Sequence, residues 1–414
     1  MEETTEEAML LPDDVVRKIL LRVATVDVVS LFRCALSCKQ WRALVADVSF
    51  LQNHWPENRC HPSSLLGFFD KRYDDGESPI FSPVSPGSEL GPRRRYLTSF
   101  VPDAPDGILD DAVPLAARGG LLLVLLITGR LGSDSFHLAV CDILAGTCDV
   151  LPPLGCAISQ FGCAVVARED CFSLDVQQGQ TPLPCYSAFF KVLAMVIERN
   201  DKGCNLYTFS SSEPNWSEPR KCLDEVWQRD DISCLQIRTG TTRVILCRGV
   251  AYWLGSYSTD PGNLPLYFTI GVNVKTGQTS STELSIPANQ TALSSFGLML
   301  SVAVDGNLSL LHLEKEGFRL NTWTRGDNGT WIRTRVIELK PPKKVWDPVY
   351  VSILSGGKSG ALFMSDMYGH VYKADPETGV MEDVTAEMFQ GSLGIMAVPI
   401  EIDWPALFMS RLSV

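Results

Sequence analysis

The sequence predicts an α+β multidomain protein, with a small N-terminal unit of three helices followed by a large all-β, propeller-like domain. Apolar residues recur at helical spacing between residues 11 and 50. Beyond residue 92, short apolar runs alternate with Gly, Asn and Asp, which is typical of strands joined by tight turns. At 414 residues the chain is long enough for both parts.

The first predicted helix starts near Pro12, which fits a first turn because a residue there needs no N–H donor. Asp13 and Asp14 then place negative charge at the positive end of the helix dipole. Thr25 and Asp27 are candidate N-caps of a second helix, and Ser37 is the candidate cap of a third. The apolar positions of the three helices are Val15, Val16, Ile19, Leu20, Val23, Val28, Leu31, Phe32, Ala35, Cys38, Trp41, Leu44, Val45 and Val48.

A helical unit of about forty residues rarely buries enough apolar surface to fold alone. Apolar residues also lie on more than one side of the first two helices, which favours a partner-binding face beside an internal one. The alternative interpretation is a helical mini-domain whose apolar residues all face its own core.

This segment resembles an F-box, on the strength of Leu11-Pro12, Ile19-Leu20, Leu31, Cys38, Trp41-Arg42 and Phe50. It departs from many relatives by having Val23-Ala24 where they carry Leu-Pro. The resemblance implies binding to a Skp-type adaptor and, through it, to cullin and RING subunits of a ubiquitin ligase. The adaptor-binding residues that it implies are Leu11, Pro12, Val15, Ile19, Leu20, Val28, Leu31, Cys34, Cys38 and Trp41.

The β domain contains one turn pattern three times, with Asp or Asn four residues before Gly. It occurs at Asp142–Gly146, Asn273–Gly277 and Asp375–Gly379. The Asx side chain caps such a turn and Gly takes the positive φ. The glycines are 131 and 102 residues apart, and division by three and two gives about 44 and 51 residues, near the length of a propeller blade. A sandwich or barrel would repeat hairpins too. We also expect a strand near residues 65–69 to pair with one near the C-terminus and close the ring.

Three stretches resemble landmarks of plant F-box-associated domains, those of grasses especially. They are Arg118-Gly119-Gly120-Leu121-Leu122, the Asp142 turn with Leu151-Pro152, and the run from Arg248 to Leu254. The implied role is target binding. The predicted boundaries are an acidic disordered tail at 1–9, the F-box at 10–51, a linker at 52–62 and the β domain at 63–410. Residues 78–92 are rich in Pro, Ser and Gly and are predicted to form an exposed loop.

Composition argues against several other classes. The net charge is −12, which disfavours nucleic-acid binding. No apolar run is long enough to cross a membrane, and the acidic N-terminus does not resemble a signal peptide, so we expect a cytoplasmic or nuclear protein. The 13 cysteines are scattered, so we expect small buried core residues and no disulfide framework, metal or cofactor.

Catalytic motifs are not recognisable. The stretch at 355–359 resembles a phosphate-binding loop but has Ser352 where that loop needs glycine. We therefore predict a non-catalytic substrate-recognition subunit of a cullin-based ubiquitin ligase, with an unidentified target protein. The alternative is a propeller enzyme or small-ligand sensor with an appended helical module.

Overall fold

The computed structural model describes most of the chain, and every structural statement below concerns the residues that it describes. They are residues 11–26, 28–54, 64–71, 77–84, 88, 90–91, 93–127, 137–156, 158–171, 189–198, 203–222, 234–237, 244–258, 265–284, 297–303, 305–314, 318–326, 329–342, 351–356, 362–366, 368–389, 393–394 and 396–412. The predicted tail at 1–9 and most of the predicted linker at 52–62 lie outside them.

The N-terminal module, defined as helices α1 to α4, has one helix more than predicted. The fourth helix continues past residue 51, where the helical part was predicted to end. The four helices are α1 (Asp13–Val26), α2 (Val28–Ser37), α3 (Lys39–Ala46) and α4 (Val48–His54).

Two of the predicted helix caps are wrong. Thr25 lies inside α1, where its hydroxyl donates to the carbonyl of Arg22. Ser37 is the last residue of α2, and its hydroxyl donates to the carbonyl of Cys34. The cap of α3 is instead Cys38, whose Sγ accepts the N–H of Trp41 at 3.4 Å. Asp27 lies outside the described residues.

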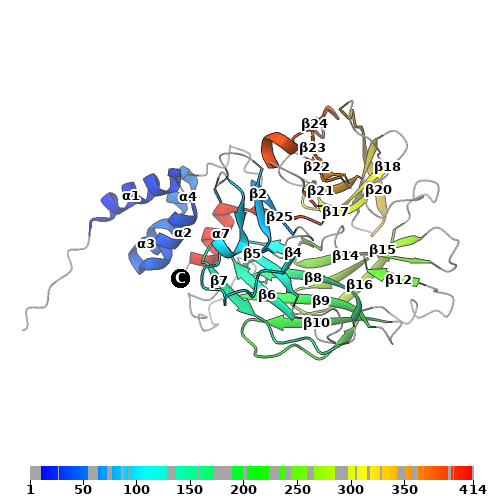
Figure 1. Cartoon of the computed structure of the whole chain (residues 1–414), viewed down its shortest axis with the longest axis horizontal. Helices are drawn as coiled ribbons and strands as arrows, with labels where there is room; N and C mark the ends of the chain where they lie inside the picture. The colour runs from blue at the N-terminus through cyan, green and yellow to red at the C-terminus, as the bar shows by residue number, and fades with distance from the viewer. Residues whose placement is uncertain are drawn as a thin grey trace, which may run out of the picture.

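The β domain consists of six antiparallel sheets. Figure 1 shows the domain beside the N-terminal helices, with its strands coloured along the chain. The strands, sheet by sheet, are β25 (Val398–Ile402), β1 (Ser64–Asp70), β2 (Ile80–Pro83) and β3 (Arg95–Tyr96); β4 (Val113–Arg118), β5 (Leu121–Leu126), β6 (His137–Asp142) and β7 (Thr147–Val150); β8 (Ile158–Ala167), β9 (Phe190–Glu198), β10 (Cys204–Ser210) and β11 (Arg220–Lys221); β12 (Cys234–Ile237), β13 (Ile245–Cys247), β14 (Val250–Ser258), β15 (Leu266–Asn273) and β16 (Thr279–Glu283); β17 (Leu298–Val302), β18 (Leu308–Glu314), β19 (Arg319–Arg325) and β20 (Trp331–Glu338); β21 (Ser352–Gly356), β22 (Leu362–Ser365), β23 (Val371–Ala374) and β24 (Met381–Asp383). Short helical segments are η1 (Leu97–Ser99), α5 (Arg168–Cys171) and η5 (Thr385–Phe389).

The sheets form a closed six-bladed propeller. Neighbouring sheets contact each other in turn, from β25 to β4, β8 and β12. In the fourth sheet β13 and β14 contact β17, then β17 contacts β21, and β21 returns to β25. The ring closes through β1 and β25, which pair antiparallel from Ser64↔Ile402 to Phe69↔Val398. The predicted pairing of residues 65–69 with a C-terminal strand is therefore confirmed. Sharing one blade between both ends of the domain leaves neither inner edge of the ring unpaired.

The three repeated turns are also confirmed. In each, the Asx Oδ1 accepts two backbone N–H groups, and the Gly takes a φ of 88°, 68° or 71°. All three join the third and fourth strands of a blade. Our division of the first separation by three is wrong, because the turns at Gly146 and Gly277 are two blades apart, as are those at Gly277 and Gly379.

Residues 78–92 are not an exposed loop as a whole. They include strand β2, in which Phe81 is fully buried and stacks edge-on against Phe100 at a ring separation of 5.6 Å. Phe69 contacts both rings. Ile80 and Phe81 lie between two prolines and belong to the first blade. The Pro, Ser and Gly residues around them predicted a loop and concealed this strand.

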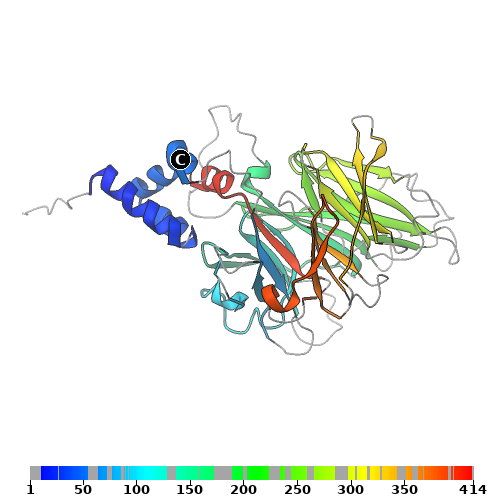
Figure 2. The same ribbon diagram turned by 90° about the horizontal axis from the view of Figure 1, so that it is seen from above.

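A C-terminal helix, α7 (Trp404–Leu412), follows the closing strand and was not predicted. Figures 1 and 2 place it between the N-terminal module and the sheets, and it contacts α2, α3 and α5. Its apolar residues share one buried core with the module and the first two blades; they are Trp404, Leu407, Phe408 and Leu412.

Candidate functional site

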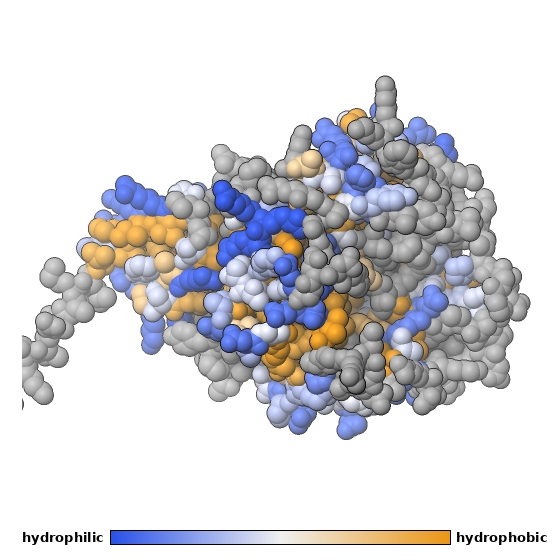
Figure 3. All heavy atoms as spheres, in the orientation of Figure 1, coloured by the Kyte–Doolittle hydropathy of each residue, from blue (hydrophilic) through white to orange (hydrophobic). Residues whose placement is uncertain are grey.

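One side of α1 carries an exposed apolar row. Val15 and Ile19 lie four residues apart on the helix and are 37% and 38% exposed, and Leu11, two residues before the helix begins, is 50% exposed and extends the row. A second stripe of α1, about 100° further around the helix, is buried in the core and consists of Val16, Leu20 and Ala24. The space-filling view shows an apolar band over α1, at the far left of the molecule (Figure 3). A helix with two apolar stripes, one buried and one exposed, is typical of a segment that binds a partner.

The start of α3 lies beside the start of this row. The side-chain amide of Gln40 donates to the carbonyl of Leu11 at 3.1 Å and to Oδ1 of Asp13 at 2.8 Å. These bonds fix the N-terminal ends of α1 and α3 against each other. They bring the exposed Cys38 and the half-buried Trp41 to the same end of the module as Leu11. Pro12 is exposed there too, and its carbonyl accepts the N–H groups of Val15 and Val16.

Three of the ten predicted binding residues are buried. Leu20, Val28 and Leu31 are at most 4% exposed and pack in the shared core. These three side chains therefore face the core of this structure, which periodicity alone could not show, and adaptor contact by them stays a prediction. Cys34 is half-buried against the same core. The other six, Leu11, Pro12, Val15, Ile19, Cys38 and Trp41, are exposed or half-buried, and adaptor binding by them stays a prediction.

The module is joined to the propeller through α7. The rings of Phe32 on α2 and Phe408 on α7 lie 5.8 Å apart, and Phe408 also contacts Trp404. The guanidinium of Arg411 lies 4.9 Å from the centre of the Phe32 ring, at cation–π distance. Helices α2 and α7 are thus in direct aromatic contact.

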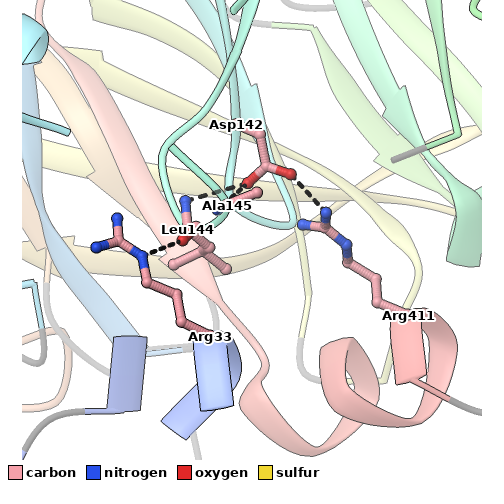
Figure 4. Close-up of polar contacts among 5 residues, drawn as sticks. All are labelled: Arg33, Asp142, Leu144, Ala145 and Arg411. Carbon is pink, nitrogen blue, oxygen red and sulfur yellow. Dashed lines mark hydrogen bonds and ion pairs between the residues drawn. The ribbon is translucent and has the colours of Figure 1, made fainter. Parts of the chain in front are cut away.

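The β6–β7 turn completes this junction. Asp142 accepts the N–H groups of Leu144 and Ala145 through Oδ1, and through Oδ2 it binds Arg411. From the other side, Nε of Arg33 on α2 donates to the carbonyl of Leu144 at 3.0 Å. Figure 4 shows Arg33 and Arg411 converging on this single turn. The turn therefore anchors both the N-terminal module and the C-terminal helix.

These junction residues were missed by sequence reasoning, although signals existed. Asp142 was recognised only as a turn residue. Apolar residues at Trp404, Leu407, Phe408 and Leu412 have helical spacing. The proximity of Arg33 and Arg411 could not be read from the sequence, because they are almost the whole chain apart.

The described part of the chain contains no group of three or more His, Cys, Asp or Glu side chains arranged to hold a metal ion. No helix within it is both long and apolar enough to span a bilayer. The stretch at 355–359 begins inside strand β21, which ends at Gly356.

Comparison with known protein families agrees with this division of the chain. Residues 9–53 match the F-box domain. Residues 94–343 match a domain of unknown function, DUF7595. Since that match covers more than half of the chain, the protein belongs to the DUF7595 family and carries an N-terminal F-box followed by a six-bladed propeller. A plant origin stays a prediction.

No curated protein matches the chain. Solved structures give distant likenesses. Puromycin hydrolase is 14% identical with a TM-score of 0.39, and the match covers 75% of this chain but 41% of the hydrolase. An α-L-arabinanase of Penicillium chrysogenum, complexed with arabinobiose, is 9% identical with a TM-score of 0.40, covering 70% of this chain and 79% of the arabinanase. A quinonprotein alcohol dehydrogenase-like protein from Bacteroides thetaiotaomicron is 12% identical with a TM-score of 0.38, covering 76% and 61%. These likenesses carry no argument about function.

Proposed function

We propose that this protein is a substrate-recognition subunit of a cullin-based ubiquitin ligase. Its F-box binds a Skp-type adaptor, which connects it to cullin and RING subunits, and its propeller binds a target protein. The observation that carries this proposal is the exposed apolar row of Leu11, Val15 and Ile19 at the start of an F-box, beside a second stripe of α1 that is buried in the core.

The physical basis of adaptor binding is the apolar row. Fully burying a Val or Ile side chain contributes about 1.5–3 kcal/mol, and these side chains are between a third and a half exposed. Contact with an adaptor would remove that remaining surface from water. Leu11 and Trp41 extend the row to α3, so the contact would join two helices rather than one.

The role is non-catalytic. By holding a target near the ligase, the chain raises the effective concentration of a target lysine without changing the chemistry of transfer. A target held by the propeller would lie in a fixed relation to the adaptor, because α7 and the β6–β7 turn join the two parts of the chain. We place this activity in the cytoplasm or nucleus. The proposal needs no cofactor, metal, nucleic acid or membrane.

The test is binding of a purified Skp-type adaptor to the full-length protein by calorimetry. A Val15→Glu, Ile19→Glu variant should weaken binding at least about tenfold, equivalent to about 1.4 kcal/mol, because it places two charges in an apolar contact. Glutamate is a good helix former, so α1 should persist.

The matched control is Ile332→Glu, Val336→Glu on strand β20. These side chains are 59% and 47% exposed and lie on the propeller, away from the F-box. The control should bind the adaptor like the wild type. Equal affinity of the α1 variant and the wild type would contradict the proposal.

A further inference from the structure

Two cysteines face each other across the hairpin that anchors the F-box. Cys141 on β6 is paired with Cys148 on β7, and their sulfur atoms are 3.8 Å apart. Both are free thiols. Cys141 is fully buried in the core shared by the F-box, α7 and the first two blades, whereas Cys148 is partly exposed.

The register makes this pair suitable for a covalent bond. On the same two strands, the N–H of Leu151 bonds to the carbonyl of Leu138 at 2.9 Å, so these opposed residues form a hydrogen-bonded pair. Pair types alternate along antiparallel strands. Cys141 is three positions from Leu138, and therefore Cys141 and Cys148 form a non-hydrogen-bonded pair. Such pairs have Cα atoms about 4.5 Å apart, which lies within the range that disulfides span.

The two thiols are not equivalent. The S–H of Cys141 donates to the sulfur of Cys148. This hydrogen bond lowers the pKa of Cys148 and, together with burial, raises the pKa of Cys141 well above its usual value. The partly exposed member is thus the one that ionises first, and the thiolate is the form that reacts with oxidants.

We propose that Cys141 and Cys148 are a peroxide-oxidisable dithiol, in which Cys148 reacts first and Cys141 resolves it. The Cys148 thiolate attacks one oxygen of hydrogen peroxide and breaks the O–O bond, which gives a sulfenic acid and, after protonation, one water. The Cys141 thiol then attacks the Cys148 sulfur, loses its proton and displaces hydroxide as a second water. Two thiols are oxidised to one disulfide, and one peroxide is reduced to two waters.

The consequence falls on the F-box junction. The β6–β7 turn lies between the two cysteines and carries Asp142 and Leu144, the partners of Arg411 and Arg33. A disulfide would hold β6 and β7 together at the base of this turn. Oxidation would therefore hinder opening of the hairpin that anchors both helices. This inference stands on the hairpin geometry and does not depend on the proposed ligase role.

The test uses the reduced full-length protein treated with hydrogen peroxide, alkylated with N-ethylmaleimide and digested with an endoproteinase that cleaves before aspartate. Cuts before Asp134, Asp142 and Asp149 put the cysteines on separate peptides, 134–141 and 142–148. Mass spectrometry should find these peptides linked, two hydrogens lighter than their sum, and separated again by dithiothreitol. The N–H of Leu151 should exchange more slowly in the oxidised protein.

Variants separate this chemistry from general oxidation. Cys148→Ser should abolish the link, and Cys141→Ala should let a sulfenic-acid probe label Cys148. Cys156→Ser is the control, because Cys156 is also half-buried but its pKa is raised by burial and the nearby Glu198; it should leave the link intact. Recovery of peptides 134–141 and 142–148 as separate alkylated thiols after treatment, or direct passage of Cys148 to sulfinic acid, would overturn the proposal. A link without slower exchange of Leu151 would overturn its effect on the hairpin.

Discussion

Replacing Asp142 with asparagine tests how the F-box is held on the propeller. Asp142 and Arg411 form an ion pair whose side chains are only 4% and 13% exposed. Asparagine keeps the size of the side chain and an oxygen that can accept the N–H groups of Leu144 and Ala145, so the turn itself should survive. What is lost is the negative charge opposite a buried guanidinium.

The expected loss of stability is large because the buried guanidinium of Arg411 has few partners other than Asp142. Removing one partner of a buried ion pair costs about 3–5 kcal/mol. Asparagine can still accept a hydrogen bond from Arg411, and the guanidinium keeps its contact with Phe32, so we expect the lower end, about 3 kcal/mol. The loss should appear as a lower urea midpoint and as faster amide exchange in α7 and α2.

Two controls make the measurement decisive. Glu338→Gln removes one partner of the Arg319–Glu338 pair, whose side chains are 53% and 74% exposed, and should cost at most about 1 kcal/mol. Adding Arg411→Met to Asp142→Asn removes the orphaned charge and should restore part of the loss. Equal effects of Asp142→Asn and Glu338→Gln, or a double variant less stable by the full sum of both changes, would refute the reasoning.

Two further predictions concern the propeller itself. Gly162→Ala should destabilise the protein by about 1–3 kcal/mol, because a Cβ there would lie 2.8 Å from the buried Trp253 ring, whose Nε1 donates to the Gly162 carbonyl. The control is Gly155→Ala, because Gly155 has open space around it. Equal urea midpoints of the two variants would contradict the steric argument. The backbone N–H groups of Thr378 and Glu377 lower the pKa of Asp375 below 3.8, so its contribution to stability is fully present above that pH and is lost as pH falls through the lowered pKa. NMR titration of Asp375 should give a midpoint below 3.8 in the folded protein, and a midpoint at or above that value would contradict the role of the turn.

The features that sequence predicted well are those set by local chemistry. An Asx residue four positions before Gly specifies a turn within one hairpin, and all three such turns form. Helical spacing likewise located α1, α2 and α3. The pairing of β1 with β25 was predicted from a general argument, the need to hide an edge, rather than from a local signal.

The features that were missed depend on how distant segments meet. Helical periodicity could not distinguish Leu20 from Ile19 as a binding residue. Only the packed structure shows that Leu20 is buried while Ile19 is exposed. The composition of residues 78–92 concealed strand β2, whose Phe81 is stabilised by rings from two other segments. The blade count needed the same information, because the spacing between equivalent turns varies from one pair of blades to the next.

The shared first blade has a consequence for the order of events during synthesis. Strand β1 leaves the ribosome early, yet its inner neighbour β25 is made more than 300 residues later, and a hydrogen bond from Gly394 to Asp70 spans 324 positions. Contacts of such long range are formed slowly. The helix that secures the F-box follows β25 directly. A growing chain would therefore display its exposed α1 row long before its propeller could close and before α7 could complete the connection between the two.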